Sequence, residues 1–227
     1  MKLCTLALFL LASTILIVPS IVQAEEPFDG KSFTGWKFHG DEKKSKWKIG
    51  MAKLDDKNPT KLLLLAGSGE MVNTGTGGVD IYTEKKYTNV HVEVEVMIPK
   101  GSNSGVYLMG EYEVQVLDSY GKQKINEGDM GGIYKTAVPK KNASKQPGEW
   151  QKFVIDFTAP KFENGKKTAN GKFDKVVLND ILIHENVEVT KSTGGGLTGH
   201  EVAEGPLMFQ GDHGAVAYRN LKIEVKK

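Results

Sequence analysis

Residues 103–121 read NSGVYLMGEYEVQVLDSYG, and the second half of this stretch alternates between polar and apolar side chains. Glu111, Glu113 and Gln115 share one parity, and the residues on the other parity are apolar or aromatic. Successive side chains of a β-strand point to opposite faces, so an extended chain gathers the polar groups on one side. The stretch therefore predicts a strand with one core face, whose polar face is either the wet side of a sheet or a binding site.

Comparable strand patterns recur along the chain, separated by glycine and proline. Gly110, between two of the runs, predicts a hairpin turn or bulge, and Asn179-Asp180, between two others, predicts a second hairpin. No segment keeps a period of 3.6 residues, so long helices are not expected. The predicted strands are residues 61–65, 91–98, 106–109, 111–117, 150–158, 175–178, 181–183, 207–210 and 216–225.

The fold class follows from these runs. Many short strands joined by glycine and proline turns are typical of an all-β sandwich, jelly roll or barrel. An antiparallel jelly roll leaves one sheet face open to solvent, which suits the alternating strands. We therefore expect an antiparallel jelly-roll sandwich that forms a single domain over residues 25–227.

The first 24 residues have the features of a secretory signal peptide. Lys2 precedes an apolar run, and the small-residue pattern before Ala24 is typical of a cleavage site. A membrane anchor is the alternative, but the run is short and no basic cluster follows it. We expect an exported bacterial protein, periplasmic or secreted, that spans no membrane after cleavage. The single cysteine, Cys4, lies within this peptide, so the remaining chain depends on its hydrophobic core rather than on disulfides.

Composition argues against several kinds of partner. The formal net charge is +2 and the lysines are scattered, so no nucleic-acid partner is expected. The five histidines show no His-x-x-x-His spacing and there is no calcium-loop pattern. We predict no metal and no cofactor, although acid pairs and loop carbonyls are able to bind calcium. The sequence does not indicate an oligomeric state.

Two pairs of glutamates have the spacing of possible catalytic groups. Glu93/Glu95 and Glu111/Glu113 each lie two residues apart, which is about 6.5–7 Å on a strand. Inverting glycosidases hold their two carboxyl groups about 6.5–9.5 Å apart, so the spacing is permissive, but a solvated strand face gives the same spacing. Gln115 and Asp118 do not reproduce the Glu-x-Asp-x-x-Glu pattern of retaining jelly-roll glucanases. The ordinary mechanism with two carboxylates is therefore poorly supported.

A second polar cluster is FQGDHG, residues 209–214. Its two glycines allow a sharp turn from which Asp212 and His213 project. Histidine exchanges a proton near neutral pH, and Asp212 is placed to orient it. The alternative is a turn in which Asp212 caps backbone amides and His213 faces water. Arg219 either offers donors to an oxygen-rich ligand or pairs with a structural acid.

Several stretches together resemble the bacterial 3-keto-disaccharide hydrolase domain family. The resemblance covers essentially the whole chain after residue 24, and its blocks occur in order. Five ordered blocks are more specific than any one alone. The blocks are FDGKSFTGW (28–36), NSG (103–105) with EYEVQVLDS (111–119), GIY (132–134) through PGEWQ (147–151), GPL (205–207) through DHG (212–214), and RNL (219–221).

This resemblance implies a concanavalin A-like lectin/glucanase fold, a carbohydrate substrate, and action on glycosides already oxidised at C3. A ketone at C3 acidifies the C2–H bond, so one base can start an elimination that releases the C1 substituent, after which water adds. On this hypothesis Glu113 is the base, and His213 with Asp212 is the acid or enolate partner. The substrate-binding groups are Tyr107, Gln115, Asp118, Gln210, Arg219 and Glu95.

Two departures from the family pattern bear on this expectation. Met109 stands where a polar or basic residue is expected, which bears on substrate preference, and Gly211 interrupts a Gln-Asp-His-Gly run, which bears on the reach of His213. A non-catalytic carbohydrate-binding module on the same fold is the main alternative function, and an envelope scaffold is a third. Which glycoside and linkage would be cleaved is not indicated by the sequence.

Overall fold

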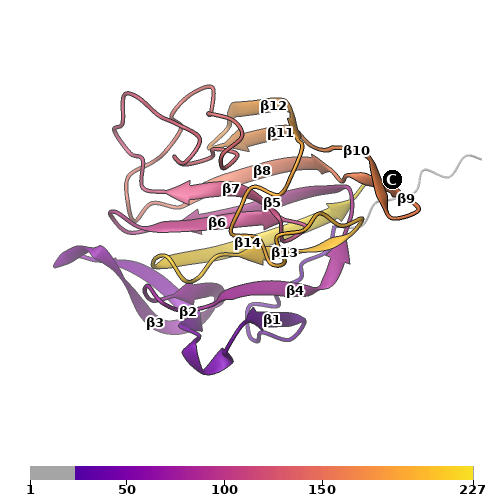
Figure 1. Ribbon diagram of the computed structural model, residues 1–227. Coiled ribbons are helices and arrows are strands. Elements are labelled where there is room, and N and C mark those ends of the chain that lie inside the picture. Colours follow the sequence, from indigo (N-terminus) through magenta and orange to yellow (C-terminus); the bar gives the residue numbers. More distant parts are fainter. Residues whose placement is uncertain (1–23, 227) are drawn as a thin grey trace, which may run out of the picture.

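The computed structural model describes residues 24–226, so the predicted signal peptide lies almost wholly outside the described residues. Two antiparallel sheets face each other (Figure 1). The five-stranded sheet has the order β1 (Trp36–His39), β4 (Asp80–Tyr87), β13 (Gly205–Phe209), β6 (Asn103–Leu108) and β7 (Tyr112–Leu117). The seven-stranded sheet has the order β12 (Ile181–Val189), β11 (Gly171–Leu178), β8 (Gln151–Thr158), β5 (Val90–Met97), β14 (Val216–Val225), β3 (Asn58–Asn73) and β2 (Trp47–Asp55).

The described residues contain little else that is regular. A two-stranded ribbon joins β9 (Lys161–Glu163) to β10 (Lys166–Ala169), and one turn of 3₁₀ helix covers Glu42–Lys44. Within residues 24–226, no helix has the length and apolar character needed to cross a bilayer. The predicted all-β antiparallel sandwich is confirmed, and each predicted strand is found within or overlapping an observed one.

The core lies between the two sheets. Strand alternation supplies it: Val92, Val94 and Val96 of β5 are buried, while Glu93 and Glu95 between them point outward. Aromatic rings join the two layers, with Tyr112 of β7 and Phe157 of β8 at 5.3 Å between ring centroids. Phe209 of β13 and Tyr218 of β14 stack at 3.9 Å. Because this interior is closely packed, the positions of both sheets are fixed relative to each other.

Both predicted hairpins are present. Met109 and Gly110 join β6 to β7 with φ of 55° and 70°, and Asn179 and Asp180 join β11 to β12 with φ of 51° and 65°. Positive φ at both central residues is typical of type I′ turns, whose twist matches that of the flanking strands. The β6–β7 turn fixes the register that pairs Tyr107 with Glu113 and Gly105 with Gln115.

Candidate active site

The outer face of the β6–β7 hairpin gathers polar residues, as the alternation predicts. Glu113 and Gln115 of β7 lie on this face beside Tyr107 and Gly105 of β6, while Val114 and its apolar neighbours enter the core. Gly105 is required for space rather than for its backbone angle. A Cβ at this position would overlap the Glu113 carboxylate and the Tyr107 ring. The missing side chain thus leaves room for the two polar groups.

These residues line a cavity of about 240 Å³. This is smaller than the pockets that hold drug-sized ligands and suits a ligand the size of a single sugar ring. Of the predicted site residues, Tyr107, Glu113, Gln115, Gln210 and His213 meet here. The remaining lining residues are Asn103, Tyr134, Lys135, Gly194 and Gly195.

Glu113 is the carboxyl group that lines this cavity, and its acidity is strongly altered. Its side chain is 2% exposed, and burial raises its pKa to about 8. The negative charges of Asp80 and Asp212 raise the pKa further, whereas the Tyr107 hydroxyl and the Lys135 ammonium lower it. A carboxyl group with a pKa near neutral can hold a proton and release it at working pH, as a general base requires.

Three neutral polar side chains, Tyr107, Gln210 and Gln115, line the cavity together with this carboxylate. Burial and the nearby Glu113 charge raise the pKa of Tyr107 well above its ordinary value, so its hydroxyl stays protonated. Gln210 is 7% exposed; its Nε2 donates to the Tyr107 hydroxyl at 3.4 Å, and its Oε1 has no protein partner. Gln115 Nε2 donates to Asn103 Oδ1 at 2.6 Å. Buried polar atoms left without a partner are costly, which favours a polar ligand in this cavity.

Buried side chains of two neighbouring strands, Asn73 of β3 and Asp80 of β4, form hydrogen bonds with the backbone of the turn that carries Asp212 and His213. Asn73, fully buried at the end of β3, donates from Nδ2 to the carbonyl oxygens of Gly75, Gly211 and Gly214 at 2.9, 2.9 and 2.7 Å. The Asp80 carboxylate accepts the Gly211 amide at 2.9 Å. His213 Nδ1 lies against Asp212 Oδ1, which leaves Nε2 as the ring nitrogen free to meet a ligand.

A glycine-rich strap closes another side of the cavity. It comprises residues 193–199, and Glu111 fastens it by accepting the Thr198 amide at 2.8 Å and the Gly199 amide at 3.1 Å. The Glu113 amide donates to Thr193 Oγ1 at 2.9 Å. A Cβ on Gly195 would lie 2.8 Å from the Tyr107 hydroxyl. Glu111 therefore supports the wall of the cavity and does not line it.

Three residues predicted to bind substrate lie elsewhere. Asp118 caps a turn beyond β7 and accepts the Gly101 amide at 2.9 Å. Glu95 and Arg219 face outward from the seven-stranded sheet, where they pair with each other at 2.7 Å. Arg219 also contacts Glu70 at 3.6 Å and stacks over the Trp150 ring at 3.9 Å. The structural-pairing interpretation of Arg219 is the one that its contacts support.

The two departures noted in the sequence also have structural explanations. Met109 occupies the β6–β7 turn and packs into the hydrophobic core, so it does not line the cavity. Gly211 is needed for close approach, because a Cβ there would overlap the Val79 carbonyl and press on the Trp47 indole. The turn thus keeps His213 at the cavity despite the extra glycine.

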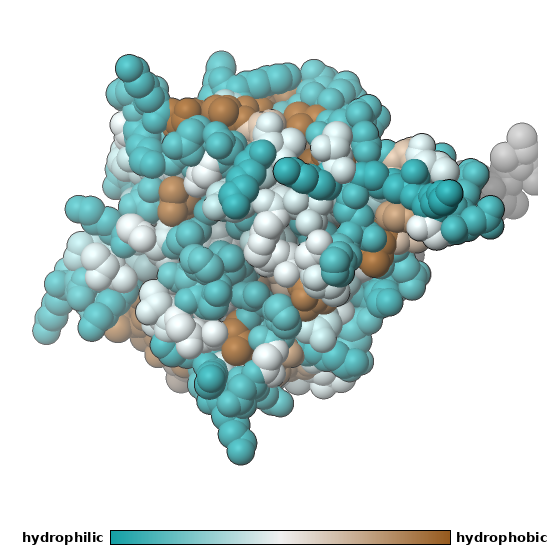
Figure 2. Space-filling view, in the orientation of Figure 1, coloured by the Kyte–Doolittle hydropathy of each residue, from teal (hydrophilic) through white to brown (hydrophobic). Residues whose placement is uncertain are grey.

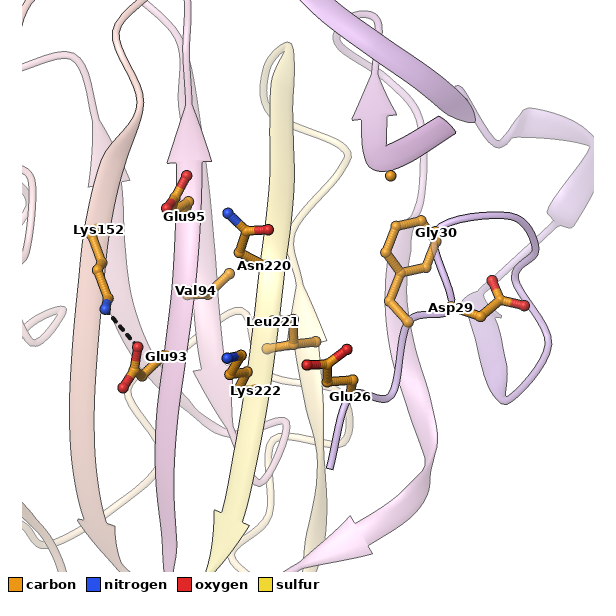
Figure 3. A pocket seen from close by; sticks show the side chains of 12 residues that line it. Glu26, Asp29, Gly30, Glu93, Val94, Glu95, Lys152, Asn220, Leu221 and Lys222 are labelled. Atoms are coloured by element: carbon orange, nitrogen blue, oxygen red, sulfur yellow. Dashed lines mark ion pairs between the residues drawn. The ribbon is translucent and has the colours of Figure 1, made fainter. Parts of the chain in front are cut away.

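A larger cavity of about 480 Å³ lies on the outer face of the seven-stranded sheet, against residues 26–30. Figure 3 shows Glu93 and Glu95 projecting from β5, with Lys152 directed at Glu93 and Glu26 on the opposite wall. Lys152 pairs with Glu93 at 2.6 Å and lowers the pKa of that carboxyl. Both glutamates of β5 in this cavity thus have a cationic partner, Lys152 for Glu93 and Arg219 for Glu95, and we place the chemistry in the smaller cavity, where Glu113 has no such partner in the described part of the chain.

Some cavity residues were missed by the sequence analysis. Asn103 shares the parity of Gly105 and Tyr107, so the strand pattern was able to reveal it. Tyr134 and Lys135 lie in an irregular turn where no periodicity marks them, and Gly194 and Gly195 carry no side chain that would indicate a role in a site. Among residues 24–226, no group of three or more His, Cys, Asp or Glu side chains is arranged to hold a metal ion.

The comparisons with known proteins agree with the fold. The family model of the 3-keto-alpha-glucoside-1,2-lyase-like domain matches residues 23–224. The chain belongs to this family. A crystal structure of a candidate glycosyl hydrolase from Parabacteroides distasonis is similar, with 26% identity, a TM-score of 0.67, and coverage of 89% of this chain and 84% of that one. A second such structure from the same organism has 20% identity and a TM-score of 0.60, covers 90% of this chain and 94% of that one, and supports the fold alone.

A curated relative gives this family membership a chemical context. The 3-keto-disaccharide hydrolase of Bacteroides thetaiotaomicron is 28% identical over 156 residues. The alignment covers 56% of this chain and 50% of the relative, so the match spans about half of the relative's length. The resemblance inferred from the sequence blocks is thus confirmed for the 3-keto-alpha-glucoside-1,2-lyase-like domain as a family.

Proposed function

We propose that this chain cleaves glycosides that carry a ketone at C3, by elimination followed by hydration. One observation carries the proposal: among the described residues that line the cavity, Glu113 is the only carboxylate. Glycosidases of the usual kind need two carboxyl groups beside the scissile bond. Elimination from a 3-keto sugar needs one base and a proton donor, which matches this set of residues and the family to which the chain belongs.

The steps can be written with their protons and electrons. Glu113 removes the C2 proton, and the electron pair of the C2–H bond forms an enolate that extends to O3. The enolate collapses to the ketone while a C1–C2 double bond forms and the C1–O bond breaks. The leaving oxygen takes a proton from His213, which Asp212 orients. Water then adds its hydroxyl to C1 and its proton to C2, so the net reaction is hydrolysis.

The remaining polar side chains hold the sugar in this scheme. Tyr107, Gln115 and Gln210 offer a hydroxyl and two amides toward the cavity. Gln210 Oε1 has no protein partner, so a sugar hydroxyl is a suitable donor for it. Burial of the ring in the cavity excludes water from the base, which keeps the pKa of Glu113 raised.

The substitution Glu113→Gln tests this function, because it keeps the shape and removes the base. We expect the release of reducing sugar from a methyl 3-keto-glucoside to fall by about 10²–10⁴-fold, the usual contribution of a general base. Glu93→Gln makes the same chemical change on the other sheet and should leave the rate unaltered. Folded wild-type protein that binds the 3-keto-glucoside without cleaving it would instead indicate a carbohydrate-binding module.

A further inference from the structure

The cavity contains one cationic side chain from lysine or arginine among its lining residues. This is Lys135, which lies in the short turn formed by residues 133–137. The Tyr134 amide donates to the Glu113 carbonyl at 3.2 Å, and Ile133 forms an isolated bridge with Val114 of β7. The turn that carries the cation is therefore tied to the strand segment that carries the base.

The backbone of Lys135 has an unusual conformation. Its φ is 54°, in the left-handed region that residues with a Cβ rarely adopt. Such conformations persist where the surrounding structure imposes them, and they gather at functional sites. Here the imposing contacts are the paired hydrogen bonds between Ile133 and Ala137, at 3.1 and 2.9 Å. The turn thus fixes the direction in which the Lys135 side chain leaves the backbone.

The ammonium group of Lys135 lies against neighbouring groups but forms no ion pair with any of the described residues. Its Nζ lies 5.1 Å from the centroid of the Tyr134 ring, and 3.7 Å from the position that a Cβ on Gly194 would take. In residues 24–226 no carboxylate lies within ion-pair distance of it, whereas Lys122, Lys152 and Lys167 each have such a partner. Its charge nevertheless reaches Glu113 and lowers the pKa of that carboxyl.

We propose that the Lys135 ammonium binds O3 of the substrate and stabilises the enolate that forms when Glu113 removes the C2 proton; this rests on the proposed function. C2 and O3 of a 3-keto sugar are separated only by C3. Because the turn that carries Lys135 is hydrogen-bonded to the strand that carries Glu113, the cation and the base can contact O3 and C2 of the same sugar ring. The lysine keeps its proton throughout and donates a hydrogen bond to O3 as negative charge develops there. When the ketone re-forms, the electron pair moves from the enolate into the new C1–C2 double bond, and the electrons of the broken C1–O bond leave with the C1 oxygen.

Hydrogen exchange at C2 of the substrate distinguishes stabilisation of the enolate by Lys135 from protonation of the leaving oxygen by His213. Wild-type protein incubated with a methyl 3-keto-glucoside in D₂O should incorporate deuterium at C2 of the glycoside that has not yet been cleaved, because enolate formation is reversible before the leaving group departs; only this uncleaved substrate is scored, since the later hydration step places a solvent deuteron on C2 of every product. Lys135→Gln should slow both exchange and cleavage by about 10²–10³-fold, the usual cost of losing one oxyanion donor. Lys135→Arg keeps the charge and should retain part of the exchange. His213→Gln should lose cleavage but keep exchange.

A matched variant and a pH profile distinguish a role of Lys135 in the reaction from a role in folding alone. Lys141→Gln removes an exposed charge from the same connecting segment outside the cavity lining, and should exchange like wild type. In Lys135→Gln the pH at which residual exchange becomes half-maximal should rise, because a charge that lowers the pKa of Glu113 is gone. Exchange in folded Lys135→Gln within twofold of wild type overturns the inference alone. Wild-type protein with neither exchange nor cleavage overturns the proposed function as well.

Discussion

The Glu113 carboxyl loses its hydration when the hairpin and the strap close around it, and its ionisation therefore opposes folding. Burial is the largest cause of its raised pKa, and the neighbouring charges of Asp80 and Asp212 act in the same direction. A group whose folded pKa exceeds its unfolded value contributes most to stability at low pH, where both states are protonated. This contribution is lost as pH rises toward the folded pKa.

A stability measurement can detect this effect without any substrate. Between the unfolded value of 4.5 and the folded value of about 8, the free energy of unfolding should fall with rising pH, in total by on the order of a few kcal/mol. Glu113→Gln removes the titration, so its Tm relative to wild type should rise by roughly 5–10 °C from pH 5 to pH 8.5. Thermal melts across this range check it, with Glu93→Gln as the control. A constant Tm difference would mean that Glu113 ionises normally.

Strand periodicity explains which residues of the candidate cavity could be predicted from the sequence. Glu113 and Gln115 lie two apart on one strand, so a single assignment of face placed both correctly. The position of Lys135 depends instead on a positive φ in a turn, and lysine carries no signal for that conformation. Gln210 and His213 were found because two glycines mark their turn.

At the scale of elements, the site is built from a hairpin and two segments fastened to it. The β6–β7 hairpin was predictable, because alternation and a glycine turn both favour it. In contrast, β4 has the sequence DIYTEKKY, in which three consecutive charged residues interrupt the alternation of polar and apolar side chains. The strand was therefore not predicted, although it contributes the buried Asp80. The strap was not predictable as a wall, because its hydrogen bonds come from Glu111, more than eighty residues earlier.

Asn73 is the residue whose loss should most affect the turn that carries His213. Asn73→Ala leaves three carbonyl oxygens without their shared donor, which should lower the free energy of unfolding by about 2–3 kcal/mol. If the turn positions His213, kcat should also fall several-fold in protein that remains folded, with little change in KM. Asn89→Ala, which removes a cap on Ala159 elsewhere in the molecule, should lower Tm without changing kcat. An unchanged kcat in folded Asn73→Ala would show that the turn needs no such support.

At the scale of the whole molecule, the sandwich presents two polar sheet faces with different electrostatics. One holds the buried carboxylate of Glu113, which has no ion-pair partner among the residues that the structure describes, and the other holds carboxylates paired with lysine or arginine. The surface seen in Figure 2 is mainly hydrophilic, with apolar side chains in small separate patches. Alternation alone marks residues such as Glu95 and Arg219 as outward-facing, but it cannot tell which sheet they belong to. This is why the predicted site combined residues from both faces.

The separation of the two faces leads to a prediction about Arg219. Its guanidinium pairs with Glu95 and with Glu70, a glutamate that is only 8% exposed, and it covers the Trp150 ring. Arg219→Gln should therefore destabilise the fold by about 1–3 kcal/mol, because it leaves Glu70 poorly compensated. Turnover per folded molecule should stay within twofold of wild type, since neither Arg219 nor Glu95 is among the residues that line the smaller cavity. Steady-state kinetics beside a denaturation curve check both parts, and Glu95→Gln should behave similarly with a smaller loss of stability. A tenfold fall in kcat at full folding would contradict the assignment and bring the seven-stranded face into the reaction.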